Sequence, residues 1–478
     1  IVIGDGEEAF PELVRLEATL RPARRGMRDR SEYLRRFTAI PGVYAPGLYP
    51  LGASGGRTVV DISAARSAGL PMPVERRSLP DLGTVELPVD LVVPSTEIFH
   101  DRSSAEISRG CMQGCRFCHA GVFYRPQRER DAGTLVRWIE ETVARTGYEE
   151  VSLASLSSAD FGGIESLAEG LIRRLRPGRV GLSFPSLRVS GLSERLATAV
   201  AEIHKTGFTV APEAGTQRMR DRINKNLNEA EILEGILAAY RSGWDLVKLY
   251  FMIGLPFETD EDVTGIAALT GRILEAIRGE PDYRARRRKF QLNVSVSSFV
   301  PKAHTPFQWA AMDRPEELER KQHLLRRAMP RPGAHLKWHE PGISRLEGIF
   351  SRGDRRLAGV IAAAWRRGAR FDGWNEWFRP GVWDEAFRHC GLDLEGYLGA
   401  LRLGGELPWS HLAMGVDAAF LAGEWERTSR AEPTPACGLP ATAVGLEEAG
   451  RPRCFACGTG CALAGMASRR RRNLELLP

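Results

Sequence analysis

Three cysteines carry the most distinctive chemistry of this chain. Cys111, Cys115 and Cys118 lie together in the glycine-containing segment Ser108–Gly121. Thiolates held this close on one loop can each bind one iron of a cubane 4Fe–4S cluster, which leaves the fourth iron without a protein ligand. A small chelating molecule can bind that open iron and be split by a single electron, because the cofactor carries the radical chemistry. The spacing therefore predicts a redox cluster with one open position.

A zinc knuckle and a set of buried structural thiols are the alternatives for these cysteines. Zinc prefers a closed tetrahedron of four ligands, commonly supplied as two close pairs. His119 is a candidate fourth ligand, but it follows Cys118 directly, which makes closure of the same tetrahedron awkward. We therefore favour the iron–sulfur cluster.

Strand-like and helical patterns alternate between residues 105 and 300 and predict the framework that positions the cysteine loop. The strand-like runs are Ala105–Ser108, Glu150–Ala154, Arg179–Phe184, Phe208–Ala211, Asp245–Met252 and Phe290–Ser298. The helical patterns are Ala132–Arg145, Ile164–Leu175, Ser193–Lys205, Glu229–Arg241 and Glu261–Arg278. Such alternation is typical of an α/β fold with a parallel sheet, here curved into a partial (β/α)6 TIM-type barrel. The loops that follow the strands then meet at one rim, where barrels hold their chemistry.

The cysteine spacing, with Phe117 directly before the third cysteine, resembles that of the radical S-adenosylmethionine (SAM) superfamily. Further motifs narrow the resemblance to cobalamin-binding radical SAM proteins, a group related to the methylthiotransferases. These motifs are Glu106–Cys111, Ser155–Asp160, Ala211–Gly215, Phe251–Pro256 and Ser298–Pro306. The resemblance implies a 4Fe–4S cluster, reductive cleavage of SAM to a 5′-deoxyadenosyl radical, and a one-electron reductant such as flavodoxin or ferredoxin.

The resemblance also implies a SAM site on the rim that carries the cysteine loop. A cation suits the carboxylate of SAM through paired hydrogen bonds, and the candidates are Arg218 and Arg188. The remaining candidates are Ser157, Ser158 and Asp160 for the amine, Glu213 and Ser186 for the ribose, and the backbone around Phe117, Gly254 and Pro256 for the adenine. Singly, such serines are more often helix caps and such charged residues more often surface ion pairs. Their convergence on one rim favours a binding site.

The first residues, Ile1–Leu20, combine a short apolar strand, a glycine turn and an amphipathic helix. This pattern is typical of the last unit of a doubly wound domain. We interpret it as the remnant of a Rossmann-like cobalamin-binding domain, and the chain as a fragment or truncation of a longer parent that binds cobalamin. The motif Asp-x-His-x-x-Gly is absent from the sequence, so no lower axial histidine can be named.

Composition and pattern divide the chain into five predicted segments. These are the remnant at 1–20, an extended connector rich in proline and glycine at 21–102, the radical SAM partial barrel at 103–312, a helical region at 313–432 and a cysteine-rich tail at 433–478. The connector is expected to wrap a neighbouring element rather than to form a domain.

A second cysteine group in the tail predicts a second metal site. Its members are Cys437, Cys454, Cys457 and Cys461. The pair spaced by two residues and followed by Gly458 resembles a zinc knuckle, where glycine permits the tight turn. Zinc is slightly favoured, an auxiliary iron–sulfur cluster is the main alternative, and unliganded thiols are the third. Cys390 stands alone and is expected to be a buried apolar residue.

The charge of the chain gives a weak indication of nucleic-acid contact. Lys and Arg number 66 against 60 Asp and Glu, with basic runs at Arg284–Lys289 and Arg469–Arg472. Such runs contact phosphates or form solvated faces. Tryptophans are frequent in the helical region and are predicted to be core residues rather than base-stacking platforms. They are Trp338, Trp365, Trp374, Trp377 and Trp383.

The sequence lacks an apolar run of membrane-spanning length, and its first residues do not resemble a signal peptide. We therefore expect a cytoplasmic protein, in whose reducing compartment grouped cysteines are metal ligands rather than disulfides. The leading functional hypothesis is a radical SAM enzyme that transfers a methyl or methylthio group to RNA or a ribosome-associated substrate. The alternatives are a small-metabolite radical SAM methyltransferase and a non-catalytic iron–sulfur or zinc protein that binds nucleic acid.

Overall fold

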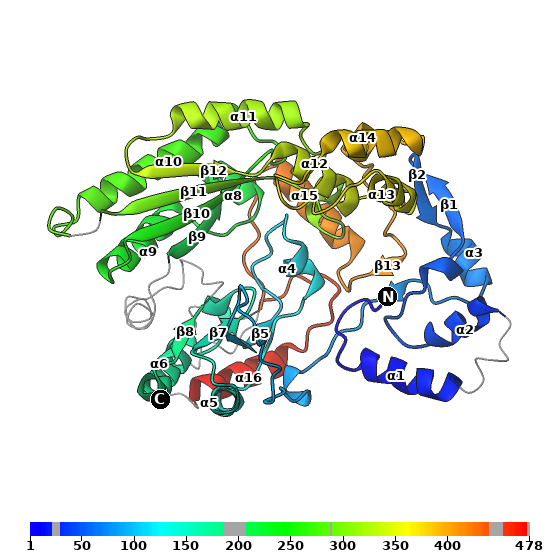
Figure 1. The fold of residues 1–478 in the computed structure, drawn as a ribbon, viewed down its shortest axis with the longest axis horizontal. Helices are drawn as coiled ribbons and strands as arrows, with labels where there is room; N and C mark the ends of the chain where they lie inside the picture. Colours follow the sequence, from blue (N-terminus) through cyan, green and yellow to red (C-terminus); the bar gives the residue numbers. More distant parts are fainter. Residues whose placement is uncertain (22–28, 185–206, 287–288, 439–452, 476–478) are drawn as a thin grey trace.

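Two parallel sheets form the centre of the molecule (Figure 1). The computed structural model describes residues 1–21, 29–184, 207–286, 289–438 and 453–475. The three-stranded sheet has the order β4 (Ser103–Glu106), β7 (Glu150–Ala154), β8 (Gly181–Ser183). The four-stranded sheet has the order β12 (Ala334–Trp338), β11 (Gln291–Ser298), β10 (Leu246–Ile253), β9 (Phe208–Glu213). Within the described residues the two sheets are not hydrogen-bonded to each other, so the barrel is open.

The α/β fold with a partial barrel is confirmed, with two differences from the predicted strands. The first strand ends at Glu106, and the next residues form β5 (Ser108–Arg109), which pairs antiparallel with β6 (Arg128–Glu129). This short pair closes the base of the cysteine loop. The second difference is β12, which the sequence pattern did not predict and which extends the sheet parallel to β11.

The helices cover the sheets as the sequence pattern predicted. They are α5 (Ala132–Thr146), α6 (Ile164–Leu175), α9 (Glu229–Arg241) and α10 (Asp260–Arg278). The helix predicted at 193–205 lies outside the described residues. Asn228 and Glu231 form the capping box that starts α9, since each side chain accepts a hydrogen bond from the backbone N–H of the other residue.

Each sheet has its own apolar core. On β10 the alternate residues Val247, Leu249, Phe251 and Ile253 are buried and pack with α9, α10 and the helical region that follows. The three-stranded sheet packs with α5 and α6 in a separate cluster. Two cores joined through loops leave the cysteine segment and α4 (His119–Phe123) between the two halves (Figure 1).

The segment predicted as an extended connector contains short regular elements. They are α2 (Arg30–Phe37), β1 (Leu51–Ser54), β2 (Arg57–Val60), α3 (Ile62–Ser67) and β3 (Val74–Glu75). Arg57 is buried, and it donates hydrogen bonds to the carbonyls of Arg352 at 2.9 Å and Gly396 at 3.0 Å. The segment therefore packs against the helical region far along the chain, while the predicted domain boundaries themselves stay predictions.

The remaining elements lie at the chain start and in the C-terminal half. They are α1 (Ala9–Leu20), α8 (Gln217–Arg222), α11 (Pro315–Ala328), α12 (Pro341–Ser351), α13 (Leu357–Arg366), α14 (Pro380–His389), β13 (Leu412–Ala413), α15 (Ala418–Ser429) and α16 (Leu463–Glu475). Among the described helices, none is both long and apolar enough to cross a membrane.

The core prediction for the tryptophans is wrong for three of the five. Trp383 is buried, but Trp365, Trp374 and Trp377 are exposed. The helical pattern does not reveal this exposure. Trp365 lies in the last turn of α13, and Trp374 and Trp377 lie in the turns that precede α14. Cys390 packs partly buried against the larger core.

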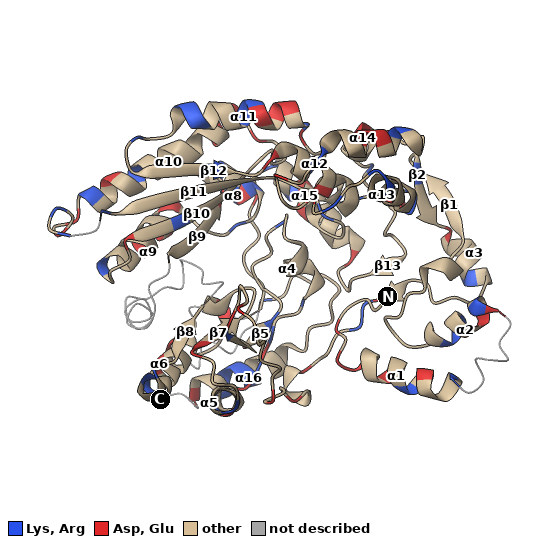
Figure 2. Cartoon of the chain, viewed as in Figure 1, with Lys and Arg blue, Asp and Glu red and all other residues tan. Residues whose placement is uncertain are grey.

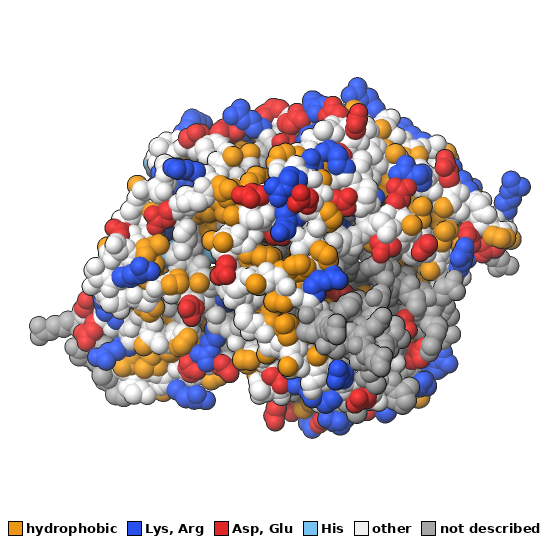
Figure 3. All heavy atoms as spheres, turned by 180° about the vertical axis from the view of Figure 1, so that it is seen from behind, with side chains coloured by type: hydrophobic (Ala, Val, Ile, Leu, Met, Phe, Trp, Pro, Cys, Tyr) orange, Lys and Arg blue, Asp and Glu red, His pale blue; other side chains and the backbone are white. Residues whose placement is uncertain are grey.

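The two basic runs are engaged within the protein in part, and Arg284, Lys289, Arg471 and Arg472 are exposed. Arg286 contacts Asp282 and stacks over the Tyr240 ring, while residues 287–288 lie outside the described part. Arg469 pairs with Asp81 at 2.6 Å, and Arg470 is buried where α16 contacts β6. Figure 2 shows basic and acidic residues interspersed along the helices, and in Figure 3 positive and negative side chains are mixed on the face seen from behind. On these views the distribution of charge does not mark a nucleic-acid-binding face.

Candidate cluster and cofactor site

The cysteine loop is held in a fixed shape by backbone contacts. The N–H of Cys118 donates to the Cys115 carbonyl at 3.1 Å, and the Cys118 sulfur accepts from the Gly121 N–H at 3.3 Å, which caps α4. Gly110 has a φ of +88°, and a Cβ there would lie 2.4 Å from the Tyr124 carbonyl oxygen. Only glycine fits at that position. The loop is thus preformed before any ligand binds.

The three thiols are close enough to perturb one another. Burial raises the pKa of Cys111 to about 12, with further contributions from Asp160, Cys115 and Cys118. Burial and Cys115 likewise raise the pKa of Cys118. Three thiolates at this site repel one another unless a cationic group compensates them, as iron does.

The number and type of donors on this loop suit a cluster. A cubane places each of the three thiolates on a different iron and leaves the fourth iron open. The donor set, its grouping on one loop and its electrostatics therefore fit a 4Fe–4S cluster.

Side chains behind the loop fasten it to both halves of the barrel. Gln113 donates to both carboxylate oxygens of Asp160 at 2.9 Å. Asn224 donates to the Gly114 carbonyl at 3.0 Å, and Asn226 donates to the Gln113 carbonyl at 3.1 Å. The loop is therefore tied to the segment after β7 on one side and to the segment after α8 on the other.

The predicted amine-binding residues lie beside the cysteine loop. Ser158 is buried and shares a hydrogen bond with Ser155 at 2.9 Å. Asp160 is engaged by Gln113, so its carboxylate also positions the loop. Ser157 is buried, and its hydroxyl has no hydrogen-bond partner in the described residues, which leaves it available to a ligand.

Glu213 lies at the end of β9 and faces a cation that the sequence analysis missed. Its carboxylate accepts a hydrogen bond from Lys225 Nζ at 3.0 Å. Both side chains lie near Cys118, whose pKa Lys225 lowers and Glu213 raises. Asn224 and Asn226 flank Lys225 and have positive φ angles of 54° and 49°, which asparagine tolerates. The sequence Asn-Lys-Asn after α8 is the signal that could have identified it.

Arg218, a candidate for the SAM carboxylate, forms an ion pair within the protein. Its guanidinium pairs with the Asp262 carboxylate near the start of α10, and its side chain is partly exposed. The other proposed carboxylate ligand, Arg188, and the proposed ribose ligand Ser186 lie outside the described residues. Lys225, which follows α8, is a described cation whose charge reaches the cysteine loop, where it lowers the pKa of Cys118.

An apolar cluster brings together the residues predicted to face the adenine. Phe117 from the cysteine loop packs against a cluster that contains Ala214, Leu255 and Phe299. Leu255 lies between Gly254 and Pro256, and Gly254 has a φ of +82° with its N–H donating to Glu258 at 2.7 Å. Phe117, Glu213 and the loop after β10 therefore converge, although they are far apart in sequence.

The loop after β11 contributes a buried histidine that was not predicted. His304 has a positive φ of 57°, and its Nε2 has no hydrogen-bond partner in the described residues. Burial lowers its pKa to about 3, helped by the nearby His119 and His411. The ring is therefore neutral at physiological pH and offers a neutral hydrogen-bonding group near the cysteine loop.

The tail cysteines lie against the cysteine loop. The N–H of Cys437 donates to the Met112 carbonyl at 3.0 Å. The hydroxyl of Thr459 contacts the sulfurs of Cys457 at 2.9 Å and Cys461 at 3.5 Å. Burial opposes ionisation of Cys457, but Thr459 and Arg125 outweigh it and lower its pKa. Cys454 is exposed.

Arg125 links the two cysteine groups electrostatically. It is buried, and Cys437, Cys457 and Cys111 all raise its pKa against the effect of burial. A buried cation is stabilised only where negative charge surrounds it. The position of Arg125 indicates that the two cysteine groups lie next to each other in the fold.

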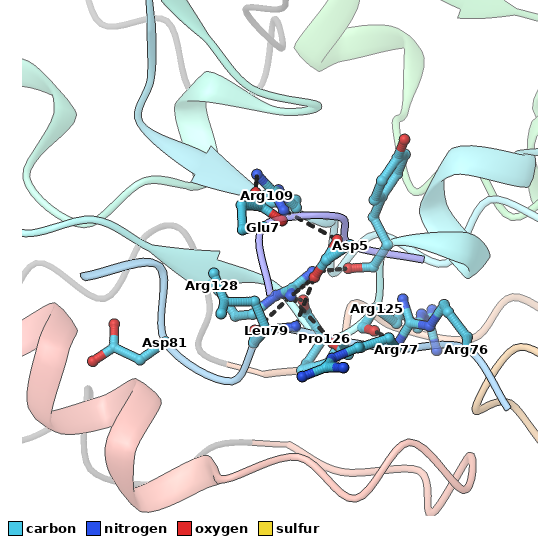
Figure 4. Close-up of polar contacts among 12 residues, drawn as sticks. Asp5, Glu7, Arg76, Arg77, Leu79, Asp81, Arg109, Arg125, Pro126 and Arg128 are labelled. Atoms are coloured by element: carbon cyan, nitrogen blue, oxygen red, sulfur yellow. Dashed lines mark hydrogen bonds and ion pairs between the residues drawn. The ribbon is translucent and has the colours of Figure 1, made fainter. Parts of the chain in front are cut away.

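The first residues of the chain close the other side of the cysteine loop (Figure 4). Arg109, on β5, pairs with Asp5 at 3.0 Å and with Glu7 at 2.6 Å, and Arg128 pairs with Asp5 at 2.6 Å. A cavity of about 470 Å³ lies there, lined by Gly4, Gly6, Arg109, Gly110 and Ser155 among others. The predicted remnant therefore packs on the loop rather than standing apart.

Comparison with known proteins identifies the region around these cysteines. Residues 105–270 match the model of the radical SAM superfamily. The chain is 32% identical over 253 residues to an uncharacterized protein, MJ0966, of Methanocaldococcus jannaschii, covering 53% of this chain and 52% of the relative. It is 28% identical over 162 residues to the tRNA-2-methylthio-N(6)-dimethylallyladenosine synthase of Syntrophomonas wolfei, covering 32% and 36%. A ribosomal protein uS12 methylthiotransferase, RimO, of Aliarcobacter butzleri is 26% identical over 167 residues, covering 33% and 36%.

The match thus spans about half, or less, of the length of these curated relatives. Among solved structures the chain matches that of the radical SAM methyltransferase TsrM from Kitasatospora setae with cobalamin and a [4Fe–4S] cluster bound. Its TM-score is 0.44 at 13% identity, covering 82% of this chain and 78% of that chain.

Proposed function

Because this chain contains a radical SAM domain at residues 105–270, we propose that it cleaves SAM reductively and transfers a methyl or methylthio group to RNA or a ribosome-associated substrate. The observation that carries the proposal is the preformed loop on which Cys111, Cys115 and Cys118 lie together. These three residues would hold the 4Fe–4S cluster. When bound, the cluster supplies the electron that splits SAM. A one-electron reductant such as flavodoxin or ferredoxin would deliver that electron.

We assign the charged end of SAM to the pair formed by Lys225 and Glu213. Lys225 carries the positive charge that the SAM carboxylate requires, and Glu213 can accept hydrogen bonds from the ribose once Lys225 turns to the ligand. The free hydroxyl of Ser157 is a partner for the amine. Phe117 and the backbone of Gly254–Pro256 provide an apolar surface for the adenine.

Lys225 gives a direct test of this assignment. We expect Lys225→Met to weaken SAM binding about tenfold or more, because one charge-assisted hydrogen bond to the carboxylate is lost. Isothermal titration of the anaerobically reconstituted protein with SAM measures the change. Arg218→Met is the matched control, and we expect it to bind SAM normally since Arg218 pairs with Asp262. An equal loss of SAM affinity in Lys225→Met and Arg218→Met would contradict the assignment.

The test of the catalytic proposal is anaerobic reconstitution with iron, sulfide, SAM and a reductant. We expect 5′-deoxyadenosine to form, and its absence from protein with a full cluster would refute SAM cleavage. Addition of total RNA with methyl-labelled SAM then tests the substrate class. Label that appears only in a small-metabolite fraction would favour the alternative function.

For the tail we propose a second metal site formed by Cys437, Cys454, Cys457 and Cys461. Four thiolates close a zinc tetrahedron, and Gly458 after the Cys454–Cys457 pair suits a zinc knuckle, so we favour zinc. An auxiliary iron–sulfur cluster is the alternative. We assign no step to cobalamin, because the sequence offers no Asp-x-His-x-x-Gly motif to this chain.

Metal analysis separates these possibilities for the tail. We expect about one zinc and about four irons per reconstituted chain, the irons belonging to the cubane on the cysteine loop. Cys457→Ser should lower the zinc content and leave the iron unchanged, since it removes one ligand of the tail site only. About eight irons per chain with no zinc, falling to about half in Cys457→Ser, would instead assign the tail an auxiliary iron–sulfur cluster.

A further inference from the structure

The turns between α13 and α14 expose four large aromatic side chains in one short segment. The exposed fractions are 58% for Trp365, 70% for Phe371, 64% for Trp374 and 52% for Trp377. We name residues 365–379 the aromatic surface. Soluble proteins rarely leave this much aromatic area in water without a binding role.

The aromatic surface is held by ordered contacts. Backbone N–H groups of Trp374 and Trp377 donate to the carbonyls of Phe371 and Trp374, each at 2.9 Å. The Phe371 and Trp377 rings meet edge to face with centroids 6.2 Å apart. Beneath them the buried Trp383 donates to the Asp372 carboxylate at 3.2 Å. These contacts fix the turn while the rings project outward.

Arginines without carboxylate partners flank these rings. Within the described residues, Arg366, Arg370 and Arg379 form no ion pair, and Arg370 stacks over the Trp365 ring at 5.3 Å. Arg367 reaches Glu385 only at 3.9 Å. The acidic residues of the segment are Asp372, which accepts a hydrogen bond from Trp383, and Glu376, which is exposed. Positive charge therefore exceeds negative charge around the rings.

We propose that the aromatic surface binds a single-stranded segment of RNA, with unpaired bases stacked on Phe371, Trp374 and Trp377. Alternating aromatic rings and arginines are suited to this ligand, since bases stack on the rings and phosphates neutralise the guanidinium groups. A second copy of the chain docked on the same surface places unpaired arginines against arginines. A purely apolar partner leaves those charges buried without compensation. The inference rests on the proposed function, for which it locates the RNA.

Fluorescence anisotropy of a labelled, mixed-sequence single-stranded RNA tests the proposal on the full chain. We expect each ring-to-alanine change to weaken binding about tenfold, and the variant Phe371→Ala/Trp374→Ala/Trp377→Ala to weaken it at least a hundredfold. Phe99→Ala, which removes an aromatic side chain that is 96% exposed elsewhere, is the matched control and should bind normally. The same RNA annealed into a duplex should bind more weakly than the single strand, because its bases are already stacked.

The arginines give an independent readout. Arg366→Gln/Arg379→Gln should weaken binding and flatten its dependence on salt concentration, since fewer phosphate charges are neutralised. All variants should keep the thermal midpoint of the parent chain and its yield of 5′-deoxyadenosine without RNA, because the residues are on the surface and outside the SAM site.

Three outcomes overturn the inference. They are failure of the parent chain to bind RNA, unchanged binding by the triple variant, and a change in sedimentation that shows the rings join two copies. None of these three outcomes contradicts the proposed cleavage of SAM if 5′-deoxyadenosine still forms. Loss of 5′-deoxyadenosine in the parent chain would instead refute the proposed function while RNA binding remained measurable.

Discussion

Replacement of Cys115 by alanine is expected to abolish both the visible absorbance of the cluster and the formation of 5′-deoxyadenosine. With two thiolates left, one more iron of the cubane loses its protein ligand. The chain should still fold, because the contact made by Cys115 within the loop uses its backbone carbonyl, which alanine retains. Absorbance after anaerobic reconstitution and chromatography of the SAM cleavage products measure the two losses.

Cys390→Ala is the matched control for this prediction. Cys390 is partly buried against the larger core and belongs to neither cysteine group. We expect a small loss of stability and a normal yield of 5′-deoxyadenosine. If Cys115→Ala retains the parental yield, the assignment of the cluster to this loop is wrong.

The largest effect on stability is expected at Arg116, which lies in the cysteine loop and is completely buried. Its Nε donates to the Glu424 carboxylate at 2.9 Å, and its two amino groups donate to the carbonyls of Arg222 at 2.9 Å and Glu432 at 2.7 Å. Arg116→Met leaves the buried Glu424 carboxylate with only the partly exposed Arg427 at 3.7 Å and the Thr434 hydroxyl as partners. We expect a loss of about 3–5 kcal/mol of unfolding free energy, measured by urea unfolding.

Two further variants test whether the loss of unfolding free energy comes from the buried Arg116–Glu424 pair rather than from the removal of any arginine. Arg145→Met removes an exposed arginine that pairs with Asp90 and Glu141, and it should leave the free energy of unfolding nearly unchanged because solvent screens these pairs. Arg116→Met/Glu424→Leu removes both charges and should recover much of the lost stability, because no uncompensated charge remains. A double variant as unstable as Arg116→Met would show that the carbonyl contacts, rather than the ion pair, dominate.

The local sequence was sufficient for the elements with strong periodicity. Helices α6 and α9 begin and end where the helical pattern placed them. Strand β12 escaped prediction because Ala334–Trp338 is half-exposed on a sheet edge and lacks the buried alternation of β10 and β11. Edge strands carry a weaker apolar signal than central strands.

The candidate cofactor residues likewise include some that local sequence indicates and others that only the fold brings together. Cys111, Cys115 and Cys118 could be predicted as ligands from their spacing, because all three lie on one loop. Arg218 was the sequence candidate for the SAM carboxylate, and we propose Lys225 in its place, a choice that depends on which cation lies near Cys118 after folding. Such proximity joins segments far apart in sequence, and no local pattern encodes it.

The sequence by itself determined the grouping of three cysteines on one loop and the alternation of strands and helices that builds an open parallel barrel. The tertiary structure decided that the tail lies against the cysteine loop, that Arg116 is a buried clamp and that Trp374 and Trp377 face water. The physical reason is that periodicity reflects contacts between near neighbours in the chain. Burial of a charge or exposure of a ring is set instead by the sum of long-range packing around it.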